Sequence, residues 1–362
     1  MTEEAPNYAY LSGFLDPVIL VDGNRQLIYL NSAASKVIDA NTIGRDLAIS
    51  FRHPSALEVV DEVLQDKLER IIEITIAAPV SQTFQLQANS VELAGGLGQG
   101  AMIVLRDVTS LKTADQMRQD FVANVSHELR SPISSLVGMI ETLQNSAKDD
   151  PNSREKFLQI MGDEAARMAR LIDDLLSLSR VEVSEHVPPI TSVSIGSILE
   201  TTIELLQGRA SKKNIVLELT FPDTLPEIPG DPDELTEVFQ NLIDNAIKYG
   251  NSKSEINIVI QKIARIPDLN HPGVSISIIN QGEGIAPEHI PRLTERFYRV
   301  DKARSREKGG TGLGLAIVKH LVNACQGEID LKSVLGEGTT FTVRLPLARV
   351  PEPVVKSLES AE

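Results

Sequence analysis

The spacing of apolar residues in the middle of the chain restricts its fold more than any other feature. Leu158, Met161, Ala165, Met168, Ile172 and Leu175 recur at steps of three and four. A similar run covers residues 111–125. Such steps place apolar side chains on one stripe of an α-helix, so we expect two long helices in a bundle or coiled coil. An ordinary amphipathic core helix has the same spacing, so the pattern alone does not identify the packing partner.

Shorter β-rich segments flank these helices. Residues 16–31 read as a strand, a turn at Asp22-Gly23-Asn24 and a second strand, and further strands are expected near 69–78, 83–93 and 100–109. After a Pro- and Ser-bearing linker at 181–194, helices are expected at 198–208, 232–249 and 314–325. Strands are expected at 215–221, 256–264, 274–279, 328–333 and 339–345. We therefore predict a multidomain α+β chain with domains at 1–109, 110–185 and 190–348 and a disordered tail at 349–362.

Composition excludes several classes of protein. The formal net charge of −15 argues against direct binding to nucleic acid. The single cysteine, Cys325, cannot form an intramolecular disulfide. No run of about 18 apolar residues is present, and the acidic, polar start does not resemble a signal peptide. We expect a cytoplasmic chain as given, and an inner-membrane anchor upstream in a natural parent stays open.

His127 has neighbours suited to nucleophilic chemistry. Glu128 follows it directly, and Pro132 lies five residues on in the same expected helix. Neutral imidazole is a nucleophile near pH 7, and an adjacent carboxylate can accept its ring proton. Proline removes a helical hydrogen bond, so we expect a local bend below the histidine.

This segment, SHELRSPI at residues 126–133, resembles the phosphoacceptor box of bacterial sensor histidine kinases. The resemblance implies that ATP phosphorylates His127 and that the phosphoryl group then passes to an aspartate of a response regulator. It also implies a helical hairpin that forms a homodimeric four-helix bundle, with Glu128 as general base. The family usually has Thr where this chain has Ser131, a position implicated in orienting water during dephosphorylation of the regulator.

A second cluster lies on the helix expected at 232–249. Asn241, Asn245 and Lys248 stand at i, i+4 and i+7, on one face. Amide oxygens can ligate Mg²⁺ and an ammonium can neutralise phosphate. The segment is similar to the N box of kinase ATP-binding domains, which implies that Asn245 holds Mg²⁺, Lys248 contacts phosphate and Tyr249 lies near the nucleotide.

Glycines mark a third cluster at residues 279–321. A glycine loop that leads straight into a helix offers backbone N–H groups to a polyphosphate. The order of these segments resembles the G1, F and G2 boxes of the GHKL-type α/β-sandwich ATP-binding domain, with the polar stretch 299–309 as a mobile lid. The expected nucleotide-binding residues are Asn241, Asn245, Lys248, Tyr249, Asn280, Gly282, Gly284, Phe297, Gly310, Thr311, Gly312, Leu313, Gly314 and Thr339.

Asn280 departs from the family pattern, which has an aspartate that accepts the adenine amino proton. Two alternatives to a kinase stay open, the first from Asn280 and the second from the N and glycine boxes, which other ATPases share. In one, weak ATP binding makes the protein a signalling scaffold or a phosphatase of its regulator. In the other, the domain belongs to the related ATPases of chaperones and topoisomerases, which the box around His127 disfavours.

The first hundred residues resemble a PAS sensor domain, which usually ends in an Asp-Val-Thr turn, here Asp107-Val108-Thr109. Its ligand or upstream protein is unknown. Residues 1–109 hold no cysteine for a flavin adduct, and His53 is a weak haem candidate. Residues 292–320 look most like the phosphate-regulon type of sensor kinase.

Overall fold

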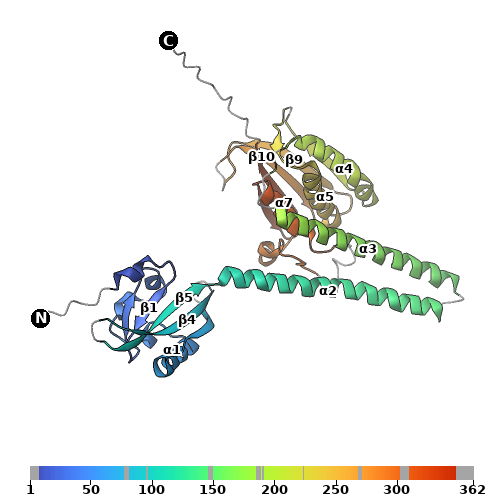
Figure 1. The fold of residues 1–362 in the computed structure, drawn as a ribbon. Helices are drawn as coiled ribbons and strands as arrows, with labels where there is room; N and C mark the ends of the chain where they lie inside the picture. Colours follow the sequence, from blue (N-terminus) through green and yellow to red (C-terminus); the bar gives the residue numbers. More distant parts are fainter. Residues whose placement is uncertain are drawn as a thin grey trace, which may run out of the picture. The chain divides into compact units, whose positions relative to one another are not determined.

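The computed structural model describes residues 8–76, 81–94, 97–145, 150–184, 189, 191–222, 224–267, 271–301 and 310–347. The chain falls into two compact units, Met1–Ala123 and Asn124–Glu362, and each is described by itself (Figure 1). Most of the expected lid, from residue 302 to 309, and the expected disordered tail lie outside the described residues.

The first unit is built on a five-stranded antiparallel sheet. Its strands are β1 (Val18–Val21), β2 (Leu27–Leu30), β3 (Arg70–Ile76), β4 (Gln82–Glu92) and β5 (Gln99–Asp107), in the order β2-β1-β5-β4-β3. Helix α1 (Pro54–Asp66) begins with proline at its first turn and packs its buried valines on the sheet. Short 3₁₀ turns occupy Ala9–Gly13, Ala34–Lys36, Ala40–Thr42 and Leu47–Ile49. The expected α+β unit is confirmed.

One buried side chain, Asn31, joins the start of this unit to its sheet. Asn31 is 2% exposed, and its Oδ1 accepts hydrogen bonds from the backbone N–H of Val18 (3.0 Å) and Ala34 (2.8 Å). Its Nδ2 donates to the carbonyls of Phe14 (3.2 Å) and Asp16 (2.9 Å). The bonds from Val18 and Ala34 satisfy buried backbone N–H groups, and the other two are partly buried.

We expect Asn31→Ala to destabilise the first unit by on the order of 3 kcal/mol, because each buried polar group left unpaired costs about 1–3 kcal/mol. Hydrogen exchange followed by mass spectrometry on residues 8–107 measures the effect. Asn41→Ala is the matched control, since Asn41 is exposed and bonds only locally to Asp39. Equal exchange rates in the two variants would contradict a structural role for Asn31.

Two long helices follow the first sheet. Helix α2 spans Thr109–Gln144 and α3 spans Pro151–Ser184, as the apolar spacing predicts. Pro132 is buried within α2, and the helix continues through it without interruption. The local bend expected at Pro132 stays a prediction. The boundary between the two units falls inside α2.

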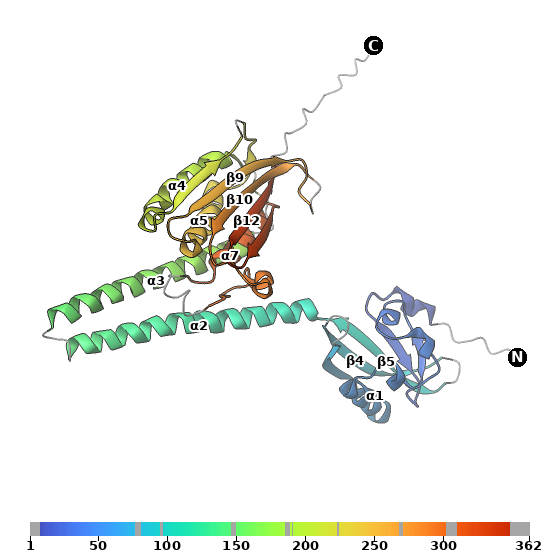
Figure 2. The ribbon, with the colours of Figure 1, turned by 180° about the vertical axis from the view of Figure 1, so that it is seen from behind.

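The second unit also holds a two-layer α/β sandwich. Its sheet contains β7 (Val216–Thr220), β9 (Glu255–Ile263), β10 (Gly273–Gln281), β11 (Glu328–Val334) and β12 (Gly338–Pro346), in the order β11-β12-β10-β9-β7. All neighbours are antiparallel except β7 and β9. Helices α4 (Ile195–Lys212), α5 (Pro232–Tyr249) and α7 (Gly314–Ala324) cover one face, as Figure 2 shows from the side of the sheet. A small sheet pairs β6 (Ser192–Val193) with β8 (Ile228–Pro229), and η5 (Pro287–Arg292) is a 3₁₀ helix.

The alternation of buried side chains explains the two layers. Along β10, Val274, Ile276 and Ile278 are fully buried under the helices, while Ser275 and Ser277 face the other side and are half-buried. The expected helix at 198–208 was too short: Gly208 does not end it, and α4 continues to Lys212 because its apolar face stays buried as far as Ala210.

Candidate functional site

Helix α5 carries one wall of the candidate site. The Asp231 side chain caps its start by accepting from the N–H groups of Asp233 (2.8 Å) and Glu234 (3.2 Å), and Pro232 occupies the first turn. The apolar face packs in the core through Leu235, Val238, Phe239, Leu242, Ile243, Ala246 and Ile247. The opposite face is polar and looks into a cavity.

This cavity has a volume of about 290 Å³ and lies between α5, the end of β10 and the loop before α7. The residues expected to bind nucleotide line it, except for Gly282, Phe297 and Leu313: they are Asn241, Asn245, Lys248, Tyr249, Asn280, Gly284, Gly310, Thr311, Gly312, Gly314 and Thr339. The structure therefore brings three separate sequence clusters to one hollow.

Close backbone approaches explain two of the glycines. Gly312 has φ +79°, and the Phe297 N–H donates to its carbonyl at 2.8 Å. A Cβ on Gly314 would lie 2.5 Å from Oδ1 of Asn241. These contacts join the loop before α7 to the segment around Phe297 and to α5. Phe297 thus supports the wall without lining the cavity.

The other two residues outside the lining are also structural neighbours of the cavity. Gly282 forms an isolated bridge with Gly250, and a Cβ on Gly282 would lie 2.6 Å from the Tyr249 carbonyl oxygen. The Leu313 side chain is fully buried at the start of α7. Its side chain packs in the core, so any contact with nucleotide falls to the backbone.

Asn280 sits in the cavity wall at the end of β10 and is 5% exposed. It pairs in register with Thr339 of β12, whose hydroxyl lies 2.8 Å from the Ser333 hydroxyl. The Ser333 hydroxyl also donates to the Gly338 carbonyl (2.8 Å) and accepts from the Ile285 N–H (2.9 Å). Ser333 therefore holds this end of the site, a role that no sequence motif indicated.

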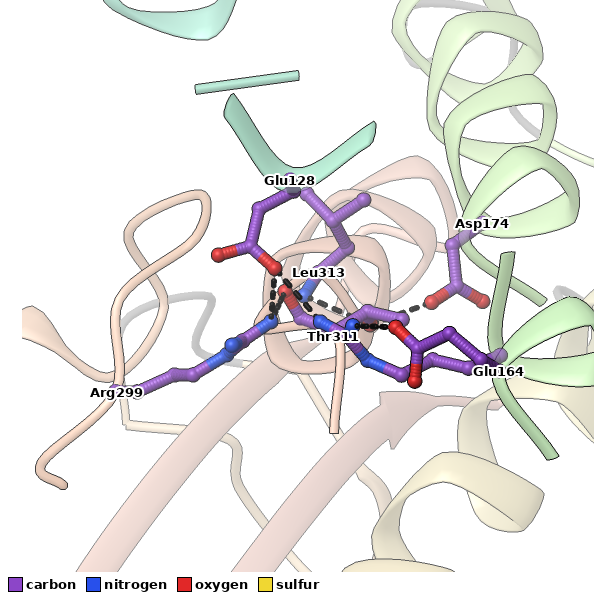
Figure 3. A network of polar contacts seen from close by, with 7 residues as sticks. Glu128, Glu164, Asp174, Arg299, Thr311 and Leu313 are labelled. Atoms are coloured by element: carbon purple, nitrogen blue, oxygen red, sulfur yellow. Dashed lines mark hydrogen bonds and ion pairs between the residues drawn. The ribbon is translucent and has the colours of Figure 1, made fainter. Parts of the chain in front are cut away.

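A polar network surrounds the residue next to His127 (Figure 3). Oε2 of Glu128 accepts from Arg167 of α3 at 2.8 Å and lies 3.4 Å from the guanidinium of Arg299. Arg299 is 5% exposed, lines the cavity and donates to the Thr311 carbonyl at 2.5 Å. Arg167 also pairs with Glu164 at 2.9 Å. His127 and Ser131 are exposed on α2.

Asp174 of α3 belongs to the same network and lines the cavity. Its Oδ2 accepts from the Thr311 hydroxyl at 2.6 Å. Burial raises the pKa of Asp174, against the opposing effect of this hydrogen bond. Sequence reasoning missed Arg167, Asp174 and Arg299, because their importance comes from contacts across long stretches of chain.

An ion triad lies at the C-terminal end of α5. Oδ2 of Asp244 is 2.7 Å from the Lys248 ammonium, and Oδ1 is 2.8 Å from Arg209 of α4. Burial acts to raise the pKa of Asp244, but Lys248 and Arg209 outweigh it and the pKa lies below its usual value. Lys213 donates to the carbonyls of Ile247 (2.7 Å) and Lys248 (2.8 Å), and burial lowers its pKa.

The donor set of the cavity fits a hard cation held mainly by phosphate. Mg²⁺ prefers oxygen ligands and usually takes only one or two from protein, with substrate phosphates and water completing the shell. Asn245 presents an amide to the cavity. Among the described residues, no cluster of three or more His, Cys, Asp or Glu could hold a metal, so the fit depends on Asn245.

Comparison with known proteins defines the class of this site. Residues 117–183 match the model of the His Kinase A (phospho-acceptor) domain. Residues 230–349 match that of the histidine kinase-, DNA gyrase B- and HSP90-like ATPases. The class is that of histidine kinases, because the phosphoacceptor match separates the chain from the chaperone and topoisomerase ATPases.

Three individual histidine kinases or sensor proteins are similar to this chain. The phosphate regulon sensor protein PhoR of Pseudomonas aeruginosa is 35% identical over 340 residues, which cover 93% of this chain and 73% of PhoR. The sensor protein SrrB of Staphylococcus aureus is 33% identical over 342 residues, 93% of this chain and 55% of SrrB. A solved structure, the histidine kinase AdeS of Acinetobacter baumannii, is 25% identical with a TM-score of 0.48, covering 61% of this chain and 98% of that one.

The chain belongs to the sensor histidine kinases of two-component systems. The phosphate regulon sensor PhoR and the sensor SrrB are similar to the chain to nearly the same degree, at 35% and 33% identity. The chain spans about half the length of SrrB. In the described part of the chain, every helix is too short or too polar to cross a lipid bilayer.

Asn280→Asp tests the one departure from the family pattern. We expect it to tighten ATP binding about fivefold and to sharpen the preference for ATP over GTP, because a charged acceptor is worth on the order of 1 kcal/mol more than a neutral one. Calorimetric titration of both nucleotides measures this. Asn152→Asp, at an exposed position on α3, is the control. Unchanged dissociation constants for both nucleotides would show that Asn280 does not read the base.

Proposed function

We propose that this histidine kinase uses ATP to phosphorylate His127 and transfers the phosphoryl group to an aspartate of a response regulator. The observation that carries the proposal is one chain with an exposed histidine followed by a carboxylate, and with a cavity where the N and glycine segments converge. Kinase activity itself follows from the family. The residue roles below are inferences from the site.

At the nucleotide end, we assign adenine to the pocket around Asn280 and Thr339 and the phosphates to Lys248 and the backbone before α7. A helix start with free N–H groups favours anionic oxygens. Asn245 would hold Mg²⁺, which when bound screens the negative charge of the phosphates. These groups position the terminal phosphoryl for in-line attack.

At the acceptor end, one ring nitrogen of His127 would form a bond to the γ-phosphorus of ATP as the bond from that phosphorus to the bridging oxygen breaks and ADP leaves, while Glu128 accepts the proton from the other ring nitrogen. Arg167 and Arg299 both contact Oε2 of Glu128 and so fix the position of its carboxylate. Arg299 also contacts the Thr311 carbonyl, so the base and the nucleotide loop share one buried cation. The arrangement supports transfer within a preorganised network.

Ser131 lies one helical turn after His127 and is exposed. We propose that its hydroxyl orients water when the protein dephosphorylates its regulator. The alternative of a scaffold or phosphatase with weak ATP binding has one supporting observation, the position of Asn280 in the cavity wall.

Dimerisation is supported by the surface of α2 and α3. Ile133, Val137 and Ile140 recur on α2 and are between 41% and 49% exposed. Leu158, Ile172 and Leu176 of α3 are between 45% and 55% exposed. Apolar stripes of this kind are buried when a second helical hairpin completes a four-helix bundle. A receiver domain is the proposed partner of this bundle.

The first unit is proposed to be a PAS-like sensor. Its antiparallel five-stranded sheet with one packed α-helix supports that assignment. Its ligand or upstream protein is not identified by the described contacts.

His127→Ala should abolish self-phosphorylation while leaving ATP binding intact, because the acceptor is not in the nucleotide cavity. Incubation with γ-labelled ATP, followed by acid and alkali treatment, detects phosphohistidine. His271→Ala is the matched control, since His271 is an exposed histidine in the same unit. Acid-labile label on the His127→Ala protein would exclude His127 as the acceptor.

Glu128→Gln should slow self-phosphorylation by about 10²-fold or more, the range of general base catalysis. Single-turnover labelling at saturating ATP measures the chemical step. Glu164→Gln serves as control, because it removes another carboxylate from Arg167 without changing the neighbour of His127. A Glu128→Gln rate within about twofold of wild type would remove the general base from the mechanism.

A further inference from the structure

Lys248 does not face the cavity as an isolated cation. Its ammonium is 2.7 Å from Oδ2 of Asp244, one helical turn earlier on α5, and both side chains line the cavity. The Asp244 side chain is 14% exposed and that of Lys248 is 27% exposed. The carboxylate is therefore poorly screened by water and cancels part of the lysine charge close to the proposed phosphate site.

Arg209 is a second cation bound to the Asp244 carboxylate. It reaches from α4 to Oδ1 of Asp244 at 2.8 Å, so the two oxygens of one carboxylate each bind a cation. Arg209 is 53% exposed and is not among the residues that line the cavity. Its contact with Asp244 is thus its route to the nucleotide.

Two hydrogen bonds from a third cation hold the backbone at the end of α5. Lys213 donates to the carbonyls of Ile247 and Lys248 at the end of α5. A neutral residue at position 244 removes the anionic partner of the Lys248 ammonium, and the two hydrogen bonds from Lys213 do not use the Asp244 carboxylate.

We infer that Asp244 and Arg209 set the nucleotide affinity of the pocket by controlling how much of the Lys248 charge acts on the phosphates. The inference rests on the proposed function, in which Lys248 contacts phosphate. Asp244 weakens phosphate binding, and Arg209 relieves that effect by sharing the carboxylate. Arg209 is a positioning residue that acts through Asp244, whose charge lies in the cavity wall beside Lys248, and their influence grows with the number of phosphates on the nucleotide.

The experiment is calorimetric titration of the full chain with ADP, AMP and adenosine in the presence of Mg²⁺. Asp244→Asn keeps the shape and an acceptor oxygen but removes the charge, and should tighten ADP binding about two- to fivefold, the range of a partly exposed ion pair. Arg209→Gln should weaken ADP binding by a similar factor. AMP should shift less, and adenosine, which carries no phosphate, should not shift.

Lys212→Gln is the matched control for Arg209→Gln. Lys212 lies on the same helix and lines the same basic groove beside Asp244, but its ammonium makes no described contact with that carboxylate. The double variant Asp244→Asn/Arg209→Gln completes a thermodynamic cycle. Arg209→Gln should lose its effect once Asp244 is neutral.

Three outcomes would overturn the inference: ADP affinity of Asp244→Asn equal to or below wild type, an equal shift for adenosine, or Lys212→Gln matching Arg209→Gln. Failure of the proposed function looks different. In that case the wild-type protein binds neither ADP nor ATP, or its label does not appear on histidine.

Discussion

The packing of one helix, α5, against the sheet is the interaction on which the site depends. Its apolar residues are buried, with Phe239 and Leu242 completely inaccessible. Burial of that face forces the polar residues at 241, 245 and 248 onto the opposite side, where the cavity opens. The amides and the ammonium are thus oriented by core packing, which is stronger than any polar contact they make themselves.

Contacts with the glycine segments then give the cavity its shape. Gly314 leaves room for the Asn241 amide, and the Phe297 N–H is bonded to the Gly312 carbonyl. A Cβ at Gly314 would press on the Asn241 amide, and Gly312 combines a positive φ with Phe297 backbone atoms 3.0 Å from the position of a Cβ, so glycine suits both places. The N and glycine segments, which are far apart in the sequence, thus pack against one another around the same cavity.

Much of this could be predicted from local pattern. The bounds of α5 follow from Asp231 and Pro232 at its start and from its apolar periodicity, and the alternation along β10 marks a strand. The predicted end of α4 at Gly208 was wrong, because burial of Leu206 and Ala210 outweighs the low helix propensity of glycine. The roles of Ser333 and Arg209 could not be predicted, because nothing in the sequence next to either residue indicates which distant groups it contacts.

A hydrogen bond from the Thr311 hydroxyl joins the loop before α7 to helix α3. A hydroxyl has one proton to donate, and that of Thr311 goes to Asp174. If Thr311 donates to a phosphate oxygen, Asp174 loses this bond while a new negative charge arrives in the cavity that it lines. Both changes raise the pKa of Asp174, as burial already does. The single hydroxyl proton of Thr311 therefore cannot serve the Asp174 carboxylate and a phosphate oxygen at the same time. Arg299 contacts both the Thr311 carbonyl and Glu128, so one buried guanidinium joins the loop before α7 to the carboxylate beside His127.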